Sequence, residues 1–173
     1  MNIQVGQKAP GFTVQGIVKG EIRDIRLEDY LKKWVVLFFY PGDFTFVCPT
    51  EVTAFSEQND EFAELNAQLL GVSVDSVHAH SAWLKELGEL KYPLLSDITK
   101  DVSRSYGVLI ESKGVSLRGA FIIDPEGVLR YQVVHDLDIG RNVDEILRVL
   151  NALQTGEMCP VGWKPGKATL RKA

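Results

Sequence analysis

The segment Trp34–Tyr40 constrains the fold more than any other part of this chain, because every residue in it is apolar, β-branched or aromatic. It is too short to cross a membrane, and it lacks the polar alternation of a strand with one wet face. It therefore predicts a central strand covered on both faces. Such a strand needs a layer on each side, which indicates an α/β fold with a central sheet flanked by helices.

Strand and helix patterns alternate after this segment. A helix is expected after Cys48, Leu69–Val74 has the pattern of a second buried strand, and a helix follows from about Ser76 to Leu87. Gly119–Ile123 is a further buried strand, and the turn residues after it should join it to Val128–His135 as an antiparallel hairpin. A short strand at 93–96 and a short helix at 101–106 are also expected.

The C-terminal part predicts one more helix and an irregular arm. The helix begins near Asn142, a good cap, and Gly156 ends it. The segment Glu157–Gly166 is rich in proline and glycine, which is typical of irregular structure. We therefore expect one domain over residues 1–155 and a C-terminal arm over residues 156–173.

Composition and charge narrow the function classes. The chain has 173 residues, 45% of them hydrophobic, which is enough for a core of its own. The formal net charge of −4 argues against a nucleic-acid surface, and no apolar stretch is long enough for a bilayer. The segment Met1–Gly6 lacks the pattern of a secretory signal, so the expected location is the cytoplasm. In a reducing compartment, a disulfide between the two cysteines would be transient and catalytic.

Cys48 is the first candidate for chemistry. It follows the Trp34–Tyr40 strand and precedes Pro49, which suits the first turn of a helix. A cysteine at a helix N-terminus meets unpaired N–H groups and the positive end of the helix dipole, which favour a nucleophilic thiolate. The competing interpretation is an inert small core residue. The position of Cys48 between a buried strand and a helix-starting proline favours a functional thiol.

Pro41, Thr45 and Cys48 reproduce a Pro-x-x-x-Thr-x-x-Cys signature, and the surrounding sequence resembles the typical two-cysteine peroxiredoxins. The resemblance covers nearly the whole chain, including the segments 116–124, 138–145 and 159–166. It implies a thioredoxin-like fold with a mixed sheet, and a thiol peroxidase that reduces hydrogen peroxide and organic hydroperoxides. No metal, flavin or other cofactor is implied.

The resemblance also implies a role for each site residue. Cys48 would attack the O–O bond and become a sulfenic acid, which Cys159 would resolve as a disulfide between subunits. The other implied residues are Pro41 shielding the sulfur, Thr45 bonding the peroxide, Arg118 stabilising the thiolate, and Glu51 with Arg141 as a supporting polar network. From residue types alone, Thr45 is also explained as a helix or turn cap and Glu51 as a capping partner. Without the resemblance, the favoured interpretation of Arg118 is a charge at the start of a strand, and that of Arg141 a solvated residue before a helix. His78, His80 and His135 have no metal spacing with the cysteines and are expected to be ordinary surface or core residues.

The expected partners follow from the same resemblance. They are a hydroperoxide, a second copy of the chain in a homodimer, and a reductant, either thioredoxin or a flavoprotein disulfide reductase. Dimers of the family commonly assemble into decamers. The basic residues Lys164, Lys167, Arg171 and Lys172 are expected to be a solvated end rather than a docking site.

Two departures from the family pattern predict resistance to overoxidation. Easily overoxidised members have a Gly-Gly-Leu-Gly stretch and a C-terminal helix with Tyr-Phe, both of which slow unwinding of the active site. Here the first place reads Gly88-Glu89-Leu90-Lys91, and residues 167–173 contain no aromatic side chain. The reaction of Cys159 with the sulfenic acid should therefore be faster than the reaction of that sulfenic acid with a second peroxide.

Three rival functions make distinct predictions. A thioredoxin-type dithiol oxidoreductase shares the strand-then-cysteine arrangement, but Cys48-Pro49-Thr50-Glu51 lacks the second cysteine of Cys-x-x-Cys. A cysteine hydrolase with a histidine base would need a local signature that is missing from the sequence. A ring-forming chaperone would protect clients without consuming peroxide. The peroxidase remains the favoured function.

Overall fold

The computed structural model describes residues 3–170, and the chain forms two compact units, residues 1–141 and 142–173. The boundary predicted after residue 155, between the domain and the C-terminal arm, stays a prediction. Arg171 and Lys172 of the predicted basic end lie outside the described residues. No helix within residues 3–170 is both long and apolar enough to cross a bilayer.

The first unit is built on a seven-stranded mixed sheet in the order β2-β1-β5-β4-β3-β8-β9. β3 pairs in parallel with β4 and antiparallel with β8, so the strand predicted from Trp34–Tyr40 does lie inside the sheet. The strands are β1 Thr13–Val18, β2 Glu21–Arg26, β3 Trp34–Phe39, β4 Ala67–Ser73, β5 Leu94–Ser96, β8 Arg118–Ile123 and β9 Leu129–His135, with a separate pair β6 Leu109–Ile110 and β7 Val115–Ser116.

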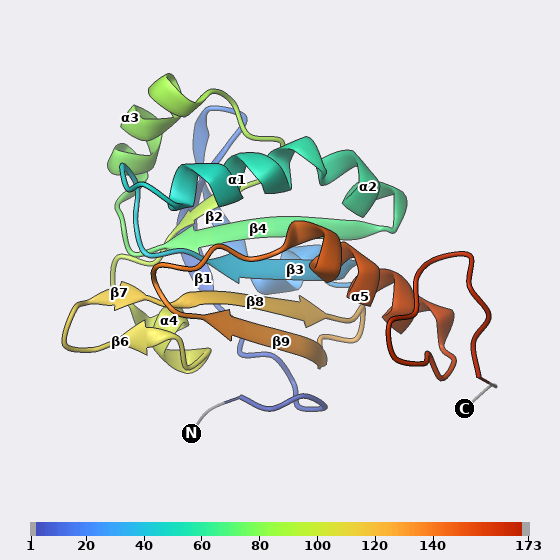
Figure 1. The fold of residues 1–173 in the computed structure, drawn as a ribbon. Helices are drawn as coiled ribbons and strands as arrows, with labels where there is room; N and C mark the ends of the chain where they lie inside the picture. Colours follow the sequence, from blue (N-terminus) through green and yellow to red (C-terminus); the bar gives the residue numbers. More distant parts are fainter. Residues whose placement is uncertain (1–2, 171–173) are drawn as a thin grey trace. The chain divides into compact units, whose positions relative to one another are not determined.

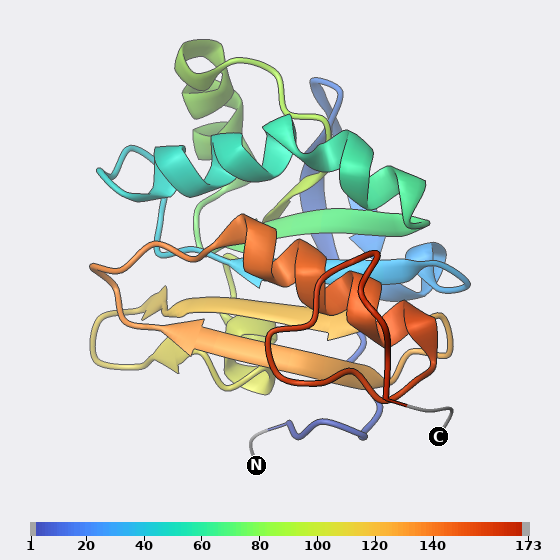
Figure 2. The ribbon, with the colours of Figure 1, turned by 45° about the vertical axis from the view of Figure 1, so that its right-hand side comes forward.

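Helices cover both faces of this sheet, as the buried strand required (Figures 1 and 2). Neighbouring residues of β3 point to opposite faces. The ring of Phe38 stacks on Phe55 of the helix α1 at 4.1 Å between centroids, whereas Phe39 contacts Tyr106 beside α4 at 5.5 Å. The helices of this unit are η1 Leu27–Tyr30, α1 Cys48–Glu57, α2 Asn59–Glu64, α3 Val77–Leu87 and α4 Asp101–Ser105.

The predicted hairpin between β8 and β9 is confirmed. Its turn is organised by the buried carboxylate of Asp124, which accepts hydrogen bonds from the backbone N–H groups of Glu126 and Val128 at 3.0 and 2.8 Å. Gly127 has a φ of +78°, a conformation that costs other residues steric strain. Arg118 is the first residue of β8, the strand that pairs with both β3 and β9.

The second unit consists of α5, Val143–Thr155, and an irregular arm. Asn142 caps the helix by accepting a hydrogen bond from the N–H of Glu145 at 3.0 Å, and Gly156 ends it in the left-handed conformation, as predicted. Trp163 ties the arm to itself and to the helix, because its indole N–H bonds the carbonyl of Lys167 and its own carbonyl accepts from Arg148.

Candidate active site

Cys48 is the first residue of α1, with Val47 as its cap and Pro49 next to it. The predicted place in the first turn is therefore confirmed. Its side chain has no exposed surface, and it carries a free thiol. The first-turn N–H groups of a helix carry the positive end of its dipole, so the sulfur lies where an anion is stabilised.

Arg118 is the cation nearest to this sulfur. Its Nη1 lies 3.4 Å from Sγ of Cys48 and donates to Oε2 of Glu51 at 2.6 Å. Its Nε donates to the carbonyl of Leu137 at 2.7 Å, which fixes the plane of the guanidinium. Because its Nη2 has no hydrogen-bond partner among the described residues, donors remain for a ligand at the sulfur.

Arg141 holds Glu51 from the other side. Its backbone N–H and Nε donate to Oε1 of Glu51 at 2.7 and 2.8 Å, and its Nη2 donates to Oε2 at 3.0 Å. The guanidinium also lies over the rings of Phe38 and Phe55, at 5.5 and 5.9 Å from their centroids. Such contacts stabilise a buried cation. One carboxylate thus orients two arginines around the thiol.

The charges of the groups around the thiol do not cancel. Two arginines and one carboxylate leave a net charge of +1 among groups that are all buried, and a thiolate at Cys48 would neutralise it. Burial raises the pKa of Glu51, but the hydrogen bonds and charge of Arg141 outweigh it, so that pKa is lowered overall. Burial likewise opposes the charge of Arg118, yet its contacts with Cys48 and Glu51 raise its pKa.

Two predicted residues lie in residues 41–47, the segment that we call the thiol loop. Thr45 is exposed, and its hydroxyl donates to the carbonyl of Gly42 at 3.1 Å. Pro41 is half-buried at the start of the loop. Neither side chain makes a hydrogen bond to Cys48 within the described residues. The structure therefore joins Cys48, Arg118, Glu51 and Arg141 in one cluster of contacts, and Pro41 and Thr45 are not part of it.

Cys159 lies in the arm of the second unit. Its sulfur is partly buried, 3.5 Å from Oγ1 of Thr155 and 3.8 Å from the carbonyl oxygen of Ala152. A hollow of about 490 Å³ opens beside it, lined by residues of α5 and the arm. The thiol is therefore reachable from this hollow and is not packed in a core.

Sequence reasoning missed a second polar cluster, which fixes the thiol loop. His80, expected to be an ordinary surface or core residue, is a fully buried core residue, with Nδ1 2.7 Å from the carboxylate of Asp43. The hydroxyl of Tyr40 donates to the same carboxylate at 2.8 Å. Asp43 and His80 are 37 residues apart in the sequence, so no local pattern predicts their contact.

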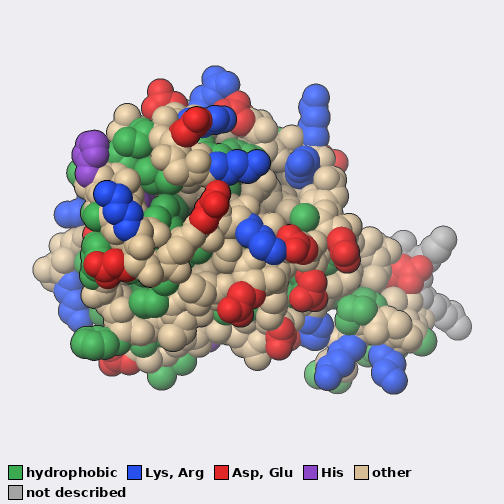
Figure 3. Space-filling model, turned by 90° about the horizontal axis from the view of Figure 1, so that it is seen from above, with side chains coloured by type: hydrophobic (Ala, Val, Ile, Leu, Met, Phe, Trp, Pro, Cys, Tyr) green, Lys and Arg blue, Asp and Glu red, His purple; other side chains and the backbone are tan. Residues whose placement is uncertain are grey.

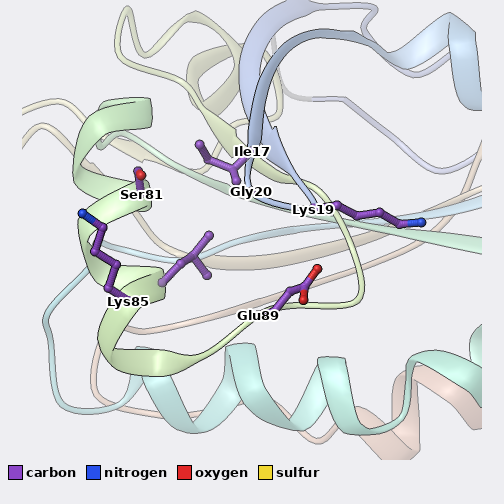
Figure 4. A pocket seen from close by; sticks show the side chains of 7 residues that line it. Ile17, Lys19, Gly20, Ser81, Lys85 and Glu89 are labelled. Atoms are coloured by element: carbon purple, nitrogen blue, oxygen red, sulfur yellow. The ribbon is translucent and has the colours of Figure 1, made fainter.

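The first unit has a further hollow whose lining does not include Cys48. A hollow of about 380 Å³ lies between the β1–β2 turn and α3, but Figure 4 shows the ammonium groups of Lys19 and Lys85 pointing away from each other. On the face that α1–α3 present, positive and negative side chains are interspersed (Figure 3). Among the described residues, no group of three or more His, Cys, Asp or Glu side chains could hold a metal ion.

The thiol of Cys48 is buried at a helix N-terminus and lies beside an arginine, in a unit built on a mixed sheet. This arrangement defines a thiol-dependent redox enzyme of thioredoxin-like fold. The chain matches the AhpC/TSA family over residues 5–132 and belongs to that family.

Individual relatives agree with this membership. The putative peroxiredoxin YkuU of Bacillus subtilis is 57% identical, over 96% of this chain and 97% of that protein. The chloroplastic 2-Cys peroxiredoxin BAS1 of Hordeum vulgare is 53% identical, over 96% of this chain and 85% of that protein. The reduced 2-Cys peroxiredoxin of Plasmodium vivax superposes with a TM-score of 0.92 at 43% identity, covering 95% of this chain and 91% of that one. The predicted resemblance is confirmed, and the chain is a thiol-dependent peroxidase that acts on a peroxide and requires a reductase partner.

Proposed function

We propose that Cys48 is the thiol that attacks the hydroperoxide, with hydrogen peroxide and organic hydroperoxides as substrates. The distance of 3.4 Å between its sulfur and Nη1 of Arg118, inside a cluster of net charge +1, carries this proposal. The thiolate donates an electron pair to one peroxide oxygen and the O–O bond breaks. The sulfur keeps that oxygen as a sulfenic acid, and the other oxygen takes a proton and leaves as water or an alcohol.

Arg118 would also stabilise the charge that develops on the leaving oxygen. The open Nη2 supports this role, because a preorganised donor stabilises a transition state more than a ground state. Glu51 and Arg141 would be positioning residues that hold this arginine. Thr45 has acceptor capacity left on its hydroxyl, so it would orient the peroxide, and Pro41 would shield the sulfur from water.

Cys159 would resolve the sulfenic acid as a disulfide with Cys48 of a second copy of the chain. A homodimer is supported by β9, an edge strand of its sheet whose Val134 side chain is 44% exposed, because an open edge favours pairing with another strand. Further assembly into decamers, reduction by thioredoxin or a flavoprotein disulfide reductase, and a cytoplasmic location complete the proposal. The net charge of −4 supports the absence of a nucleic-acid partner.

Substitution of the two cysteines separately tests this assignment. Cys48→Ser should abolish peroxide consumption in a stopped-flow assay with fully reduced protein, whereas Cys159→Ser should still consume about one equivalent of peroxide per chain in a single turnover. Both variants should keep the far-ultraviolet circular dichroism of the wild type. Undiminished peroxide consumption by folded Cys48→Ser would disprove the role of this thiol.

A further inference from the structure

Residues 157–170 of the second unit, which we call the arm loop, close on themselves. The backbone N–H of Leu170 donates to the carbonyl of Met158 at 2.8 Å, and the hydroxyl of Thr169 donates to the carboxylate of Glu157. Figure 2 shows this segment, in red, turning back beside α5. A segment whose two ends are bonded to each other is a compact loop rather than a flexible tail.

Trp163 fixes the middle of the arm loop. Its side chain is only 6% exposed, and its indole N–H donates to the carbonyl of Lys167 at 2.9 Å. Its backbone N–H donates to the carbonyl of Pro160 at 3.1 Å. The loop is therefore held by its own residues both at its ends and at its centre.

Arg148 joins the arm loop to α5. Its Nε and Nη2 donate to the two carboxylate oxygens of Glu145 at 2.6 and 2.8 Å, and its Nη1 donates to the carbonyl of Trp163 at 2.8 Å. The paired bonds to Glu145 fix the plane of the guanidinium, so the third bond holds Trp163 in one place. The side chain of Arg148 is 27% exposed, which shields these bonds partly from water. One arginine thus sets where the arm loop lies along α5.

Cys159 is held within this frame at the last turn of α5. Its sulfur lies 3.5 Å from Oγ1 of Thr155 and 3.8 Å from the carbonyl oxygen of Ala152. The hydroxyl of Thr155 is itself fixed, because it donates to the carbonyl of Ala152 at 2.7 Å and accepts from the N–H of Glu157 at 3.1 Å. The thiol therefore has a defined place in the lining of the hollow of about 490 Å³, which Arg148 lines as well.

We propose that Arg148 is a positioning residue for resolution, because it holds the arm loop on α5 and so presents Cys159 to the sulfenic acid as a preoriented thiol. The inference rests on the proposed roles of the two cysteines. A reacting group held in one place has a higher effective concentration than the same group on a flexible tether. In the reaction, the sulfur of Cys159 forms an S–S bond with Cys48, the S–O bond breaks, and the thiol proton leaves with the oxygen as water.

Arg148→Met removes the donors and retains much of the side-chain length. Glu145 is 46% exposed, so its carboxylate stays solvated and no buried charge is left unpaired. Trp83 contacts Phe44 of the thiol loop at 6.3 Å between ring centroids, so its fluorescence should follow the reaction in a stopped-flow instrument. A first phase, whose rate rises with peroxide concentration, reports the attack on peroxide, and a second phase reports disulfide formation. The substitution should slow the second phase about tenfold, as expected for the loss of a hydrogen bond from a charged group, and leave the first within about twofold.

Thr169→Val loosens the same loop at its ends, because it removes the hydroxyl that bonds Glu157. It should also slow disulfide formation, and it keeps the test decisive if Arg148→Met does not fold. Arg104→Met is the matched control, because Arg104 likewise bonds two carboxylates, those of Asp101 and Glu111, but in the first unit. Its two phases should keep the wild-type rates.

A further measurement shows whether Arg148 acts through Cys159. In the Cys159→Ser background, added dithiothreitol takes the place of the second thiol and reacts with the sulfenic acid of Cys48. Adding Arg148→Met to this background should leave the rate of that reaction unchanged. A general disturbance of the site around Cys48 would change it.

Disulfide formation at the wild-type rate or faster in the folded loop variants would overturn the proposal, and so would an equal slowing of the reaction with dithiothreitol. A failure of the proposed function would be distinct, because the wild-type protein itself would then show no disulfide between Cys48 and Cys159 by mass spectrometry.

Discussion

Replacing Arg118 by methionine should slow the attack on peroxide by about 100-fold without unfolding the protein. Methionine retains much of the length and removes the charge and all donors. Glu51 would keep its three hydrogen bonds from Arg141, so the carboxylate would not be left unpaired. The substitution therefore tests the chemistry of the guanidinium rather than the packing of the site.

The magnitude follows from the distance between Nη1 and the sulfur. At 3.4 Å, two unit charges attract by about 5 kcal/mol at an effective dielectric constant of 20. Water that enters the space left by the guanidinium would replace part of this attraction. The lower estimate of the lost stabilisation is therefore one hydrogen bond to a charged group, about 1.5–3 kcal/mol. That range corresponds to about 10- to 150-fold in rate, and loss of a donor to the leaving oxygen adds to it.

The second-order rate constant of the first fluorescence phase, measured at several peroxide concentrations, is the quantity to compare. Arg130→Met is the matched control, because Arg130 also forms an arginine–carboxylate bond, 2.6 Å from Asp124, on the same hairpin. It should react at the wild-type rate. A rate constant for Arg118→Met within threefold of the wild type would show that the arginine has no part in the attack.

Three further outcomes are expected. Glu51→Gln should lower the melting temperature at pH 7 by about 10 °C, because breaking a buried ion pair costs about 3–5 kcal/mol. The pKa of Glu51 is lowered from 4.5, so the stability that its ionised form contributes is present above pH 4.5 and is lost as the pH falls. The melting temperatures of variant and wild type should therefore converge in acid. A difference in melting temperature that stays constant with pH would contradict this. Cys159→Ser should abolish the peroxide-induced dimer on non-reducing gels and accumulate sulfinate at Cys48, and a persisting covalent dimer would refute its resolving role. Wild-type protein turning over at micromolar peroxide should keep most Cys48 out of the sulfinate form by mass spectrometry, as Gly88–Lys91 predicts; majority sulfinate would contradict it.

The elements that the sequence predicts are those whose patterns are local. The strand from Trp34 and the helix from Cys48 follow from one continuous apolar run and one proline, and both are confirmed within a residue. The β8–β9 hairpin follows from turn chemistry at Asp124. In each case the signal and the structure lie within a few residues of each other.

What the sequence did not predict depends on distant pairing. β2, Glu21–Arg26, is an exception: it forms a local hairpin with β1, but it exposes most of its side chains and has no apolar pattern that would predict a strand. Arg141 and Glu51 are 90 residues apart, and Asp43 and His80 are 37 apart. Spacing cannot reveal such contacts, so the roles of the arginines came from the family resemblance and the role of His80 was missed.

The two clusters around Cys48 impose opposite demands on the same segment. Ionising the thiol completely gains at most about 30-fold at pH 7 over an ordinary cysteine, so the closed site must contribute mainly by orienting donors, which requires a fixed thiol loop. The next step requires the loop to open. In the proposed cycle the thiol loop is therefore fixed during the attack on peroxide and leaves its place before the disulfide between Cys48 and Cys159 forms.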